Sequence, residues 1–204
     1  MGRTLALVAL AGVLLGVSAQ LLRQVEGPAM ALGGATAPWL TIGFLLAVWT
    51  TRHRNSFRAG SGHGVAIAAV YLLTWLASYH ATFAIRESVT QAAAWREAAP
   101  WLLLGGPVAV LLGVAAAAAH KNGVLGDLCL ALPIAWSVPE LALFMQEGPA
   151  HTILVALPTL LPALSPLLVV GRRDVNLLRV LIACVLFGVA ALAFLPLARN
   201  LIHS

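Results

Sequence analysis

Glu140 is the residue whose position most strongly suggests chemistry, because it lies inside an apolar stretch. That stretch runs from Val124 to Met145 and also holds Pro133 and Pro139. An ionisable side chain at membrane depth costs roughly 2.5–3.5 kcal/mol on insertion scales, so it usually marks a site. Pro139 removes a backbone donor, which frees a carbonyl beside the acid. Two interpretations follow: a site for a proton, a cation or a hydroxylated solute, or a carboxylate that pairs with an arginine and locks two helices together.

Three more prolines, Pro158, Pro162 and Pro166, recur every four residues in the next apolar stretch. Each removes a hydrogen bond and clashes with the carbonyl four residues back, so this stretch is predicted to bend, unwind or re-enter. The alternative is a kinked helix that serves packing alone. Together with Pro133 and Pro139, these helix-breaking residues place the expected pocket between residues 124 and 170.

An aromatic stripe marks a third apolar stretch, where Tyr71, Trp75, Tyr79 and Phe83 recur every four residues. Such a stripe is typical of a packing or lipid-facing surface. His80 lies beside it and could carry a proton or bond to a ligand, or simply to a neighbouring helix. The candidates for ligand binding or ion pairing, most of which are predicted to share a depth in the outer half of a membrane, are Glu140, His80, Tyr79, Arg86, Trp136 and Gln20.

Signatures of catalysis and of metal binding are missing. The sequence contains no HExxH, GxSxG, Walker or CxxC motif, which are the patterns that announce common enzyme sites. Cys129 and Cys184 stand singly in apolar stretches and are expected to be buried free thiols. His53 and His63 flank a basic loop without ligand spacing. We therefore expect no catalytic residue, no cofactor and no metal, and hence no enzyme.

The elements that must position these residues are apolar stretches of about 20 residues, the length of helix that crosses roughly 30 Å of hydrocarbon. The 204 residues are 61% hydrophobic and 9% charged, against about 25% charged in soluble domains. We predict a single all-α membrane domain over residues 1–204, a polytopic transmembrane helix bundle with about seven spans. The spans are expected at Thr4–Leu22, Met30–Trp49, Gly64–Ile85, Pro100–Ala119, Val124–Met145, Thr152–Val170 and Val175–Ala198.

The first and sixth stretches leave the number of membrane spans open. Arg3, the apolar run that follows it and the small residues before Gln20 resemble a secretory signal, whose removal would leave six spans. We expect this stretch to stay uncleaved, because further spans follow directly. Gly12 and Gly16 form a GxxxG pattern in it, which lets another helix approach closely. A re-entrant sixth stretch would also leave six spans.

Basic residues predict the orientation. Eleven arginines and one lysine lie between or at the ends of the spans. With the N-terminus in the cytoplasm, eight of these charges lie inside and four outside, as the positive-inside rule requires. The loop from Arg52 to Arg58 contributes most of this difference. No basic run is interleaved with aromatic residues, so nucleic acid is not an expected partner. The expected partners are the lipid bilayer and, in addition, other membrane subunits or a second copy of the chain. The excess of Ala, Leu, Val and Arg over Lys fits a GC-rich bacterial genome. The expected location is therefore the bacterial plasma membrane.

A family resemblance is carried by the segment from Ala11 to Gly16, the Ala37-Pro38-Trp39 sequence, the aromatic stretch from Tyr71 to Tyr79 and Glu140. With these features the chain resembles an uncharacterised family of small actinobacterial membrane proteins, a domain of unknown function. The resemblance implies a multi-helix membrane fold. It implies no established activity and no catalytic residues.

Two functions are compatible with these features. The first is a solute-binding or transport component with a polar site in the outer half of the membrane, similar to the substrate-binding subunits of vitamin transporters. The second is a structural or assembly subunit of a larger membrane complex, in which Gly12 and Gly16 and the aromatic stripe form helix interfaces.

Overall fold

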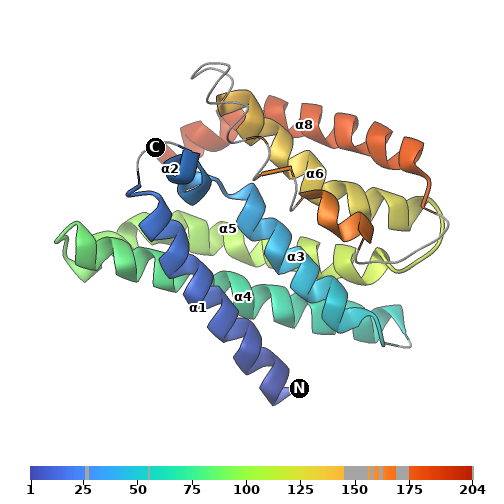
Figure 1. Cartoon of the computed structure of the whole chain (residues 1–204), viewed down its shortest axis with the longest axis horizontal. Helices are drawn as coiled ribbons and strands as arrows, with labels where there is room; N and C mark the ends of the chain where they lie inside the picture. Colours follow the sequence, from blue (N-terminus) through green and yellow to red (C-terminus); the bar gives the residue numbers. More distant parts are fainter. Residues whose placement is uncertain are drawn as a thin grey trace.

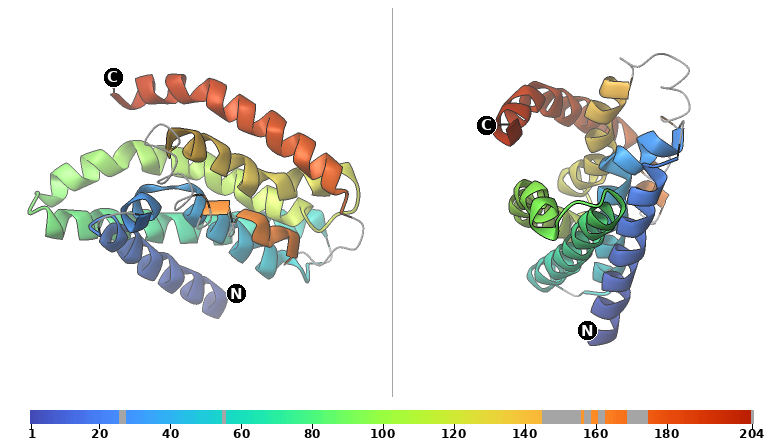
Figure 2. Two further views of the ribbon diagram at one scale, coloured as in Figure 1. Left: turned by 45° about the horizontal axis from the view of Figure 1, so that its top comes forward. Right: turned by 90° about the vertical axis from the view of Figure 1, so that its left-hand side faces the viewer.

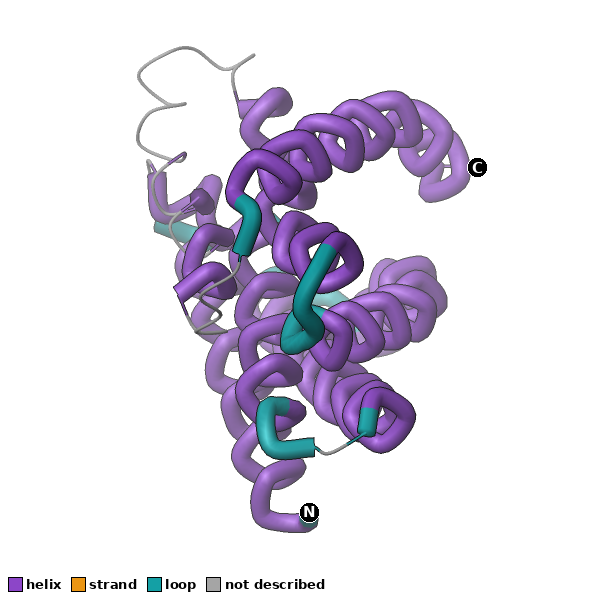
Figure 3. Tube along the Cα trace, turned by 90° about the vertical axis from the view of Figure 1, so that its right-hand side faces the viewer, coloured by secondary structure: helices purple, strands orange, loops and turns teal. Residues whose placement is uncertain are grey.

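A computed structural model of the chain describes residues 1–25, 28–54, 56–144, 156, 159–160, 163–168 and 175–203. All regular structure in these ranges is helical, with no strand, as Figure 3 shows for the described residues. The helices, in chain order, are α1 (Gly2–Leu22), α2 (Pro28–Gly34), α3 (Ala37–Thr51), α4 (Phe57–Arg86), α5 (Gln91–Ala118), α6 (Val124–Phe144) and α8 (Leu177–His203). The all-α prediction is therefore confirmed.

Four of these helices are long and apolar enough to cross a membrane: α1, α4, α5 and the part of α6 from Val124 to Ala142. Two further apolar helices are shorter, namely α3 and the segment Leu177–Ala190 of α8. The predicted number of seven spans is therefore not confirmed for the described part of the chain.

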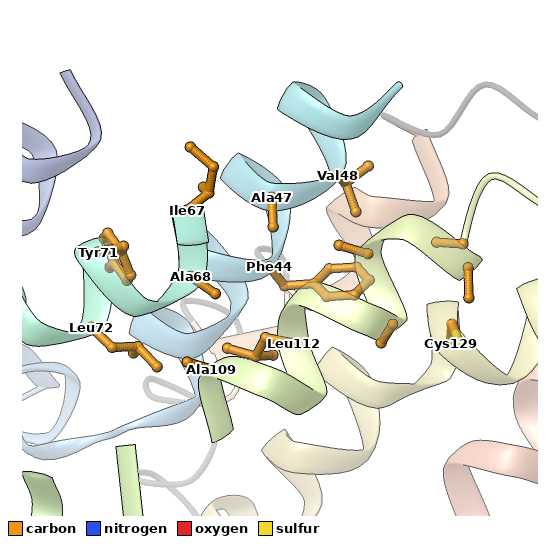
Figure 4. Close-up of a cluster of buried hydrophobic side chains, with 14 of the residues drawn as sticks. Phe44, Ala47, Val48, Ile67, Ala68, Tyr71, Leu72, Ala109, Leu112 and Cys129 are labelled. Carbon is orange, nitrogen blue, oxygen red and sulfur yellow. The ribbon is translucent and has the colours of Figure 1, made fainter. Parts of the chain in front are cut away.

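The centre of the fold is a group of four helices, α1, α3, α4 and α5. The long helices α4 and α5 lie side by side and antiparallel (Figure 1). Helix α1 packs across α4 at an angle, and both helices run in the same general direction. Apolar side chains from α3, α4, α5 and α6 fill the interior between them. Figure 4 shows this core, which includes Phe44, Val48, Ile67, Tyr71, Leu112 and Cys129.

Glycines bring the backbones of these helices into direct contact. A Cβ atom on Gly16 of α1 would lie 2.4 Å from the Trp75 carbonyl oxygen of α4. A Cβ on Gly64 of α4 would lie 2.5 Å from the Gly113 carbonyl oxygen of α5. Since no side chain fits at such distances, these positions accept glycine alone. The GxxxG pattern of α1 thus serves a close approach, as predicted, and the neighbour is α4 of the same chain.

A second group consists of α6 and α8, which pack on each other in parallel. The Cys184 thiol lies 3.7 Å from the Ala131 carbonyl oxygen, and Gly188 faces Val138. Helix α8 is the outermost element of this group (Figure 2). Most of the expected span Thr152–Val170 lies outside the described residues; within it, residues 163–168 are helical.

The stretch Met30–Trp49 was expected to be one span, and the structure divides it into two helices. The helix is interrupted after Gly34 and begins again at Ala37, with Thr36 at the N-cap position. Glycine ends helices readily, whereas threonine before a helix and Pro38 in its first turn begin one. Gly33 also packs on α1, since its Cβ would lie 2.5 Å from the Ala19 carbonyl oxygen. These features divide the stretch into α2 and α3.

Pro133 and Pro139 do not break their helix, contrary to the sequence prediction. Helix α6 continues through both of them from Val124 to Phe144. The carbonyl groups that they free belong to Cys129 and Ala135, four residues back. Prolines are tolerated in apolar helices that pack against other helices. Pro166 lies in the helical residues 163–168, while Pro158 and Pro162 lie outside the described residues.

The contrast between two glycines of α4 tests the close packing. Alanine favours a helix by about 1 kcal/mol over glycine, whereas overpacking a tight contact costs typically 1–3 kcal/mol. We expect Gly64→Ala to lower the free energy of unfolding, because Gly113 blocks its Cβ. Gly62→Ala, where nothing lies within 4 Å of the new Cβ, should be neutral or stabilising. Denaturant unfolding in detergent measures both, and equal effects would contradict the α4–α5 packing.

Candidate functional site

The Glu140 side chain of α6 binds the N-terminus of α3. Its Oε1 atom accepts hydrogen bonds from the Thr36 backbone N–H at 2.5 Å and from the Thr36 hydroxyl. The Ala37 N–H lies 3.0 Å from both Oε1 and Oε2. One carboxyl group therefore accepts from three donors at the start of a helix more than 100 residues away in sequence.

The local sequence of α3 explains why a partner from outside is needed. The first backbone N–H groups of any helix have no acceptor within it. A threonine at the N-cap usually supplies one, yet the Thr36 side chain makes no such bond and donates to Glu140 instead. Pro38 has no N–H to satisfy. Glu140 thus provides the cap that α3 does not provide for itself.

The electrostatics of this contact are favourable on both sides. A helix N-terminus carries roughly half a positive charge, so it attracts a carboxylate. Backbone N–H groups left unpaired in apolar surroundings cost several kcal/mol each. Ala37 is fully buried and Glu140 is partly buried. The contact therefore satisfies donors and an acid that would each be costly alone.

Arginine was the expected partner of Glu140, and the structure places the described arginines elsewhere. The Arg23 guanidinium donates to the Tyr79 hydroxyl at 2.8 Å, and Arg86 is exposed in the last turn of α4. Arg179 lies 3.8 Å from the Asp127 carboxylate. Within the described residues, Glu140 links two helices as one interpretation required, but its partner is a helix N-terminus.

The aromatic stripe packs inside the four-helix group. The ring centroids of Trp39 and Trp75 are 6.3 Å apart, and those of Trp75 and Tyr79 are 5.8 Å apart. Trp39 stands two residues after Ala37, so the first turn of α3 carries both the Glu140 contact and the start of this aromatic cluster. The packing interpretation of the stripe is confirmed for Tyr71 and Trp75, which are buried.

Several buried polar atoms near this turn have no hydrogen-bond partner among the described residues. They are the indole nitrogens of Trp39 and Trp75 and the Gln20 side-chain oxygen. Gln20 is 1% exposed, and its neighbour Ala19 packs with both tryptophans. Buried polar groups are nearly always paired, with protein or with ordered water. These atoms are therefore places where water or a polar solute group would find donors and an acceptor.

The remaining candidates do not join the Glu140 contact. His80 lines a cavity of about 100 Å³ between α4 and α5, together with Ala84, Ala94 and Trp95. Trp136 is half-buried and packs against the apolar core from α6. The candidates predicted at a shared depth are thus divided among different contacts.

Thr36 and Ala37 are the site residues that the sequence interpretation missed. Their contribution is made largely by backbone N–H groups, which every residue except proline possesses. The signal that could have found them is the start of a helix within an apolar stretch, after Gly33 and Gly34 and before Pro38.

Metal ligands are not gathered anywhere in the described residues, where no group of three or more His, Cys, Asp or Glu side chains could hold an ion. Cys129 and Cys184 are buried free thiols, as predicted.

Comparison with known proteins adds no relative, since no protein-family model, no curated protein and no solved structure matches the chain. The resemblance to a family of small actinobacterial membrane proteins stays a prediction.

Two substitutions of Glu140 separate its charge from its capping role. Glu140→Leu should lower the free energy of unfolding by roughly 1–3 kcal/mol, because it leaves buried donors unsatisfied. Glu140→Gln should cost less, since an amide oxygen still accepts from Thr36 and Ala37. Denaturant unfolding in detergent measures both against Glu97→Leu, a control at an exposed acid of α5. A Glu140→Leu protein as stable as the control would show that the cap contributes nothing.

Proposed function

We propose that this chain is a multi-pass membrane protein that acts as a solute-binding or transport component, with its site at the break between α2 and α3. The observation that carries this proposal is the N-terminus of α3, which meets the Glu140 carboxylate of α6 inside an apolar helix bundle. Discontinuous helices in transporters place such N-termini at the binding site for polar groups of the solute.

Membrane embedding is supported by the four long apolar helices and by the large apolar side chains on their outer faces. The helix directions support an N-terminus in the cytoplasm. Arg3, Arg52, Arg54, Arg58, Lys121 and Arg179 are at the end where α1 begins, whereas Arg23, Arg86 and Arg96 are at the other. An excess of positive charge on one side is the usual sign of the cytoplasmic face.

The parallel packing of α6 and α8 supports a full crossing between them. A re-entrant segment would return α8 antiparallel to α6. Counting α2 and α3 as one interrupted span, this arrangement favours the seven-span interpretation over the six-span one.

Solute binding uses the same donors that Glu140 now occupies. The N–H groups of Thr36 and Ala37 and the Thr36 hydroxyl suit a carboxylate, a phosphate or a hydroxyl oxygen. A solute bearing such a group competes with Glu140 for α3. The indole nitrogens of Trp39 and Trp75, which have no hydrogen-bond partner among the described residues, add donors nearby. Release of Glu140 from α3 is the step that opens the site.

The alternative function is structural, with Glu140 as a permanent link that holds α6 and α8 to the rest of the bundle. The observation that favours it is the complete pairing of the Glu140 contact in the structure. Gly12 and Gly16, which were candidates for contacts with another subunit, are occupied by α4 of the same chain. A structural role would therefore use a different surface.

Water access to the break distinguishes the two functions without knowledge of the solute. Gly34 has open space around it, so a Gly34→Cys variant, made with Cys129 and Cys184 replaced by alanine, should fold. We expect a membrane-impermeant thiol reagent to label it in liposomes, because thiolates form and react in water. Leu14→Cys, on an exposed apolar position of α1, is the control and should stay unlabelled. Equal protection of both positions would favour the structural role.

Adding Glu140→Gln to Gly34→Cys tests whether the acid closes the site. A neutral amide holds the N-terminus of α3 less strongly than a carboxylate does. We expect faster labelling of Gly34→Cys in the double variant, with membrane expression unchanged. An unchanged labelling rate would show that Glu140 does not control access.

A further inference from the structure

A second polar feature lies at the opposite end of α3 from Glu140. It is a cavity of about 220 Å³ where the start of α1, the end of α3 and the start of α4 meet. Thr4, Trp49, Arg52, His53, Arg54 and His63 contribute to its walls. No acidic residue is among the residues that line it.

The arginines of this cavity bind histidines, and among the described residues no acidic side chain pairs with either arginine. The Arg52 Nε donates to the His53 Nε2 at 2.8 Å, and an Arg54 terminal nitrogen lies 3.4 Å from the His63 Nδ1. Arginine has donors alone, so each imidazole nitrogen must offer its lone pair, which a neutral ring provides. A guanidinium has five N–H donors. Most donors of both arginines are therefore free for another acceptor.

The end of α3 does not cancel this positive charge. A helix C-terminus carries roughly half a negative charge, whereas Arg52 and Arg54 carry one full positive charge each. His63 is 8% exposed, so part of the wall is removed from solvent. The net charge of the cavity wall is therefore positive, which favours binding of an anion.

The surroundings of the cavity are those of a membrane interface. Trp49 is 52% exposed and the Arg52 guanidinium lies 5.6 Å from its ring centroid. Nearby, the Lys121 ammonium lies 4.7 Å from the Phe57 ring centroid. Aromatic and basic side chains concentrate at the depth of lipid headgroups. Under the proposed embedding, this cavity opens at the cytoplasmic headgroup layer.

We propose that this cavity binds a phosphate group through Arg52 and Arg54, with His53 and His63 orienting the two guanidinium groups. Arginine pairs with phosphate through two parallel hydrogen bonds, which gives it preference over simple anions. Drug-sized ligands need about 300–1,000 Å³, and a water molecule takes about 30 Å³. A cavity of about 220 Å³ therefore suits a phosphate group with a few waters. The phosphate belongs either to a lipid headgroup or to a free anion.

Two probes distinguish these sources. Inorganic phosphate is titrated into the detergent-purified protein at constant ionic strength, with chloride as the reference, and the unfolding midpoint is followed. Separately, nanodiscs of phosphatidylcholine are compared with nanodiscs that also contain phosphatidylglycerol, and native mass spectrometry counts the lipids retained. Stabilisation by phosphate alone identifies a free anion. Retention of phosphatidylglycerol alone identifies a headgroup site, and this arm alone rests on the proposed membrane embedding.

Matched variants test whether stabilisation by phosphate or retention of lipid depends on the cavity. Arg52→Gln with Arg54→Gln should weaken binding at least about tenfold, since each removes a charge-assisted hydrogen bond. Arg58→Gln removes one charge from the first turn of α4, outside the cavity wall, and should bind as the parent does. Arg52→Lys with Arg54→Lys keeps the loop charge and hence the orientation, and should weaken binding because lysine lacks the planar fork.

Three results would overturn the proposal: no phosphate-specific response to either probe, equal weakening by Arg58→Gln, or unchanged binding in both double variants. None of them involves Glu140 or the break at Gly34, so they are independent of the proposed solute site.

Discussion

The contact between the Glu140 carboxyl group and the N-terminus of α3 is the constraint on which the arrangement of the helices depends. A helix that starts inside an apolar bundle has free N–H groups at its first turn. Neither lipid tails nor aliphatic side chains can accept hydrogen bonds from them. Glu140 accepts from Thr36 and Ala37, and in doing so it joins α6 to α3. Helix α8 packs chiefly on α6. One carboxyl group therefore contributes to holding the α6–α8 pair against the four-helix group.

Close backbone packing gives this contact a rigid frame. Gly16 sets α1 directly on α4, and Gly64 with Gly113 sets α4 on α5. Gly43 of α3 accommodates the Tyr71 ring, since a Cβ there would lie 2.8 Å from it. Because these four helices meet at such short range, α3 cannot shift far without a clash. The donors of Thr36 and Ala37 are thus held at a fixed place for whatever acceptor reaches them.

The sequence predicted the helices and the special position of Glu140, because apolar stretches of about 20 residues and an acid within one are visible in composition alone. It did not predict the partner, since backbone N–H groups leave no side-chain signature. Hydropathy also continues through Gly33 to Thr36, so the break was not recognised. The opposite error occurred at Pro133 and Pro139, where prolines were expected to break a helix that continues through both of them. Prolines are tolerated inside apolar helices that pack against others.

The short length of α3 accounts for the polar groups at both of its ends. Its 15 residues extend about 22 Å at 1.5 Å per residue, less than the roughly 30 Å of a hydrocarbon core. In a membrane, a helix of this length would not reach both interfaces, and its unpaired groups would have to be satisfied by other parts of the protein. Glu140 meets the positive N-terminus, whereas Arg52 and Arg54 follow the negative C-terminus. Each charge lies where the helix dipole favours it. The dipole of this one helix therefore explains why Glu140 lies at one end of the bundle and the basic cavity at the other.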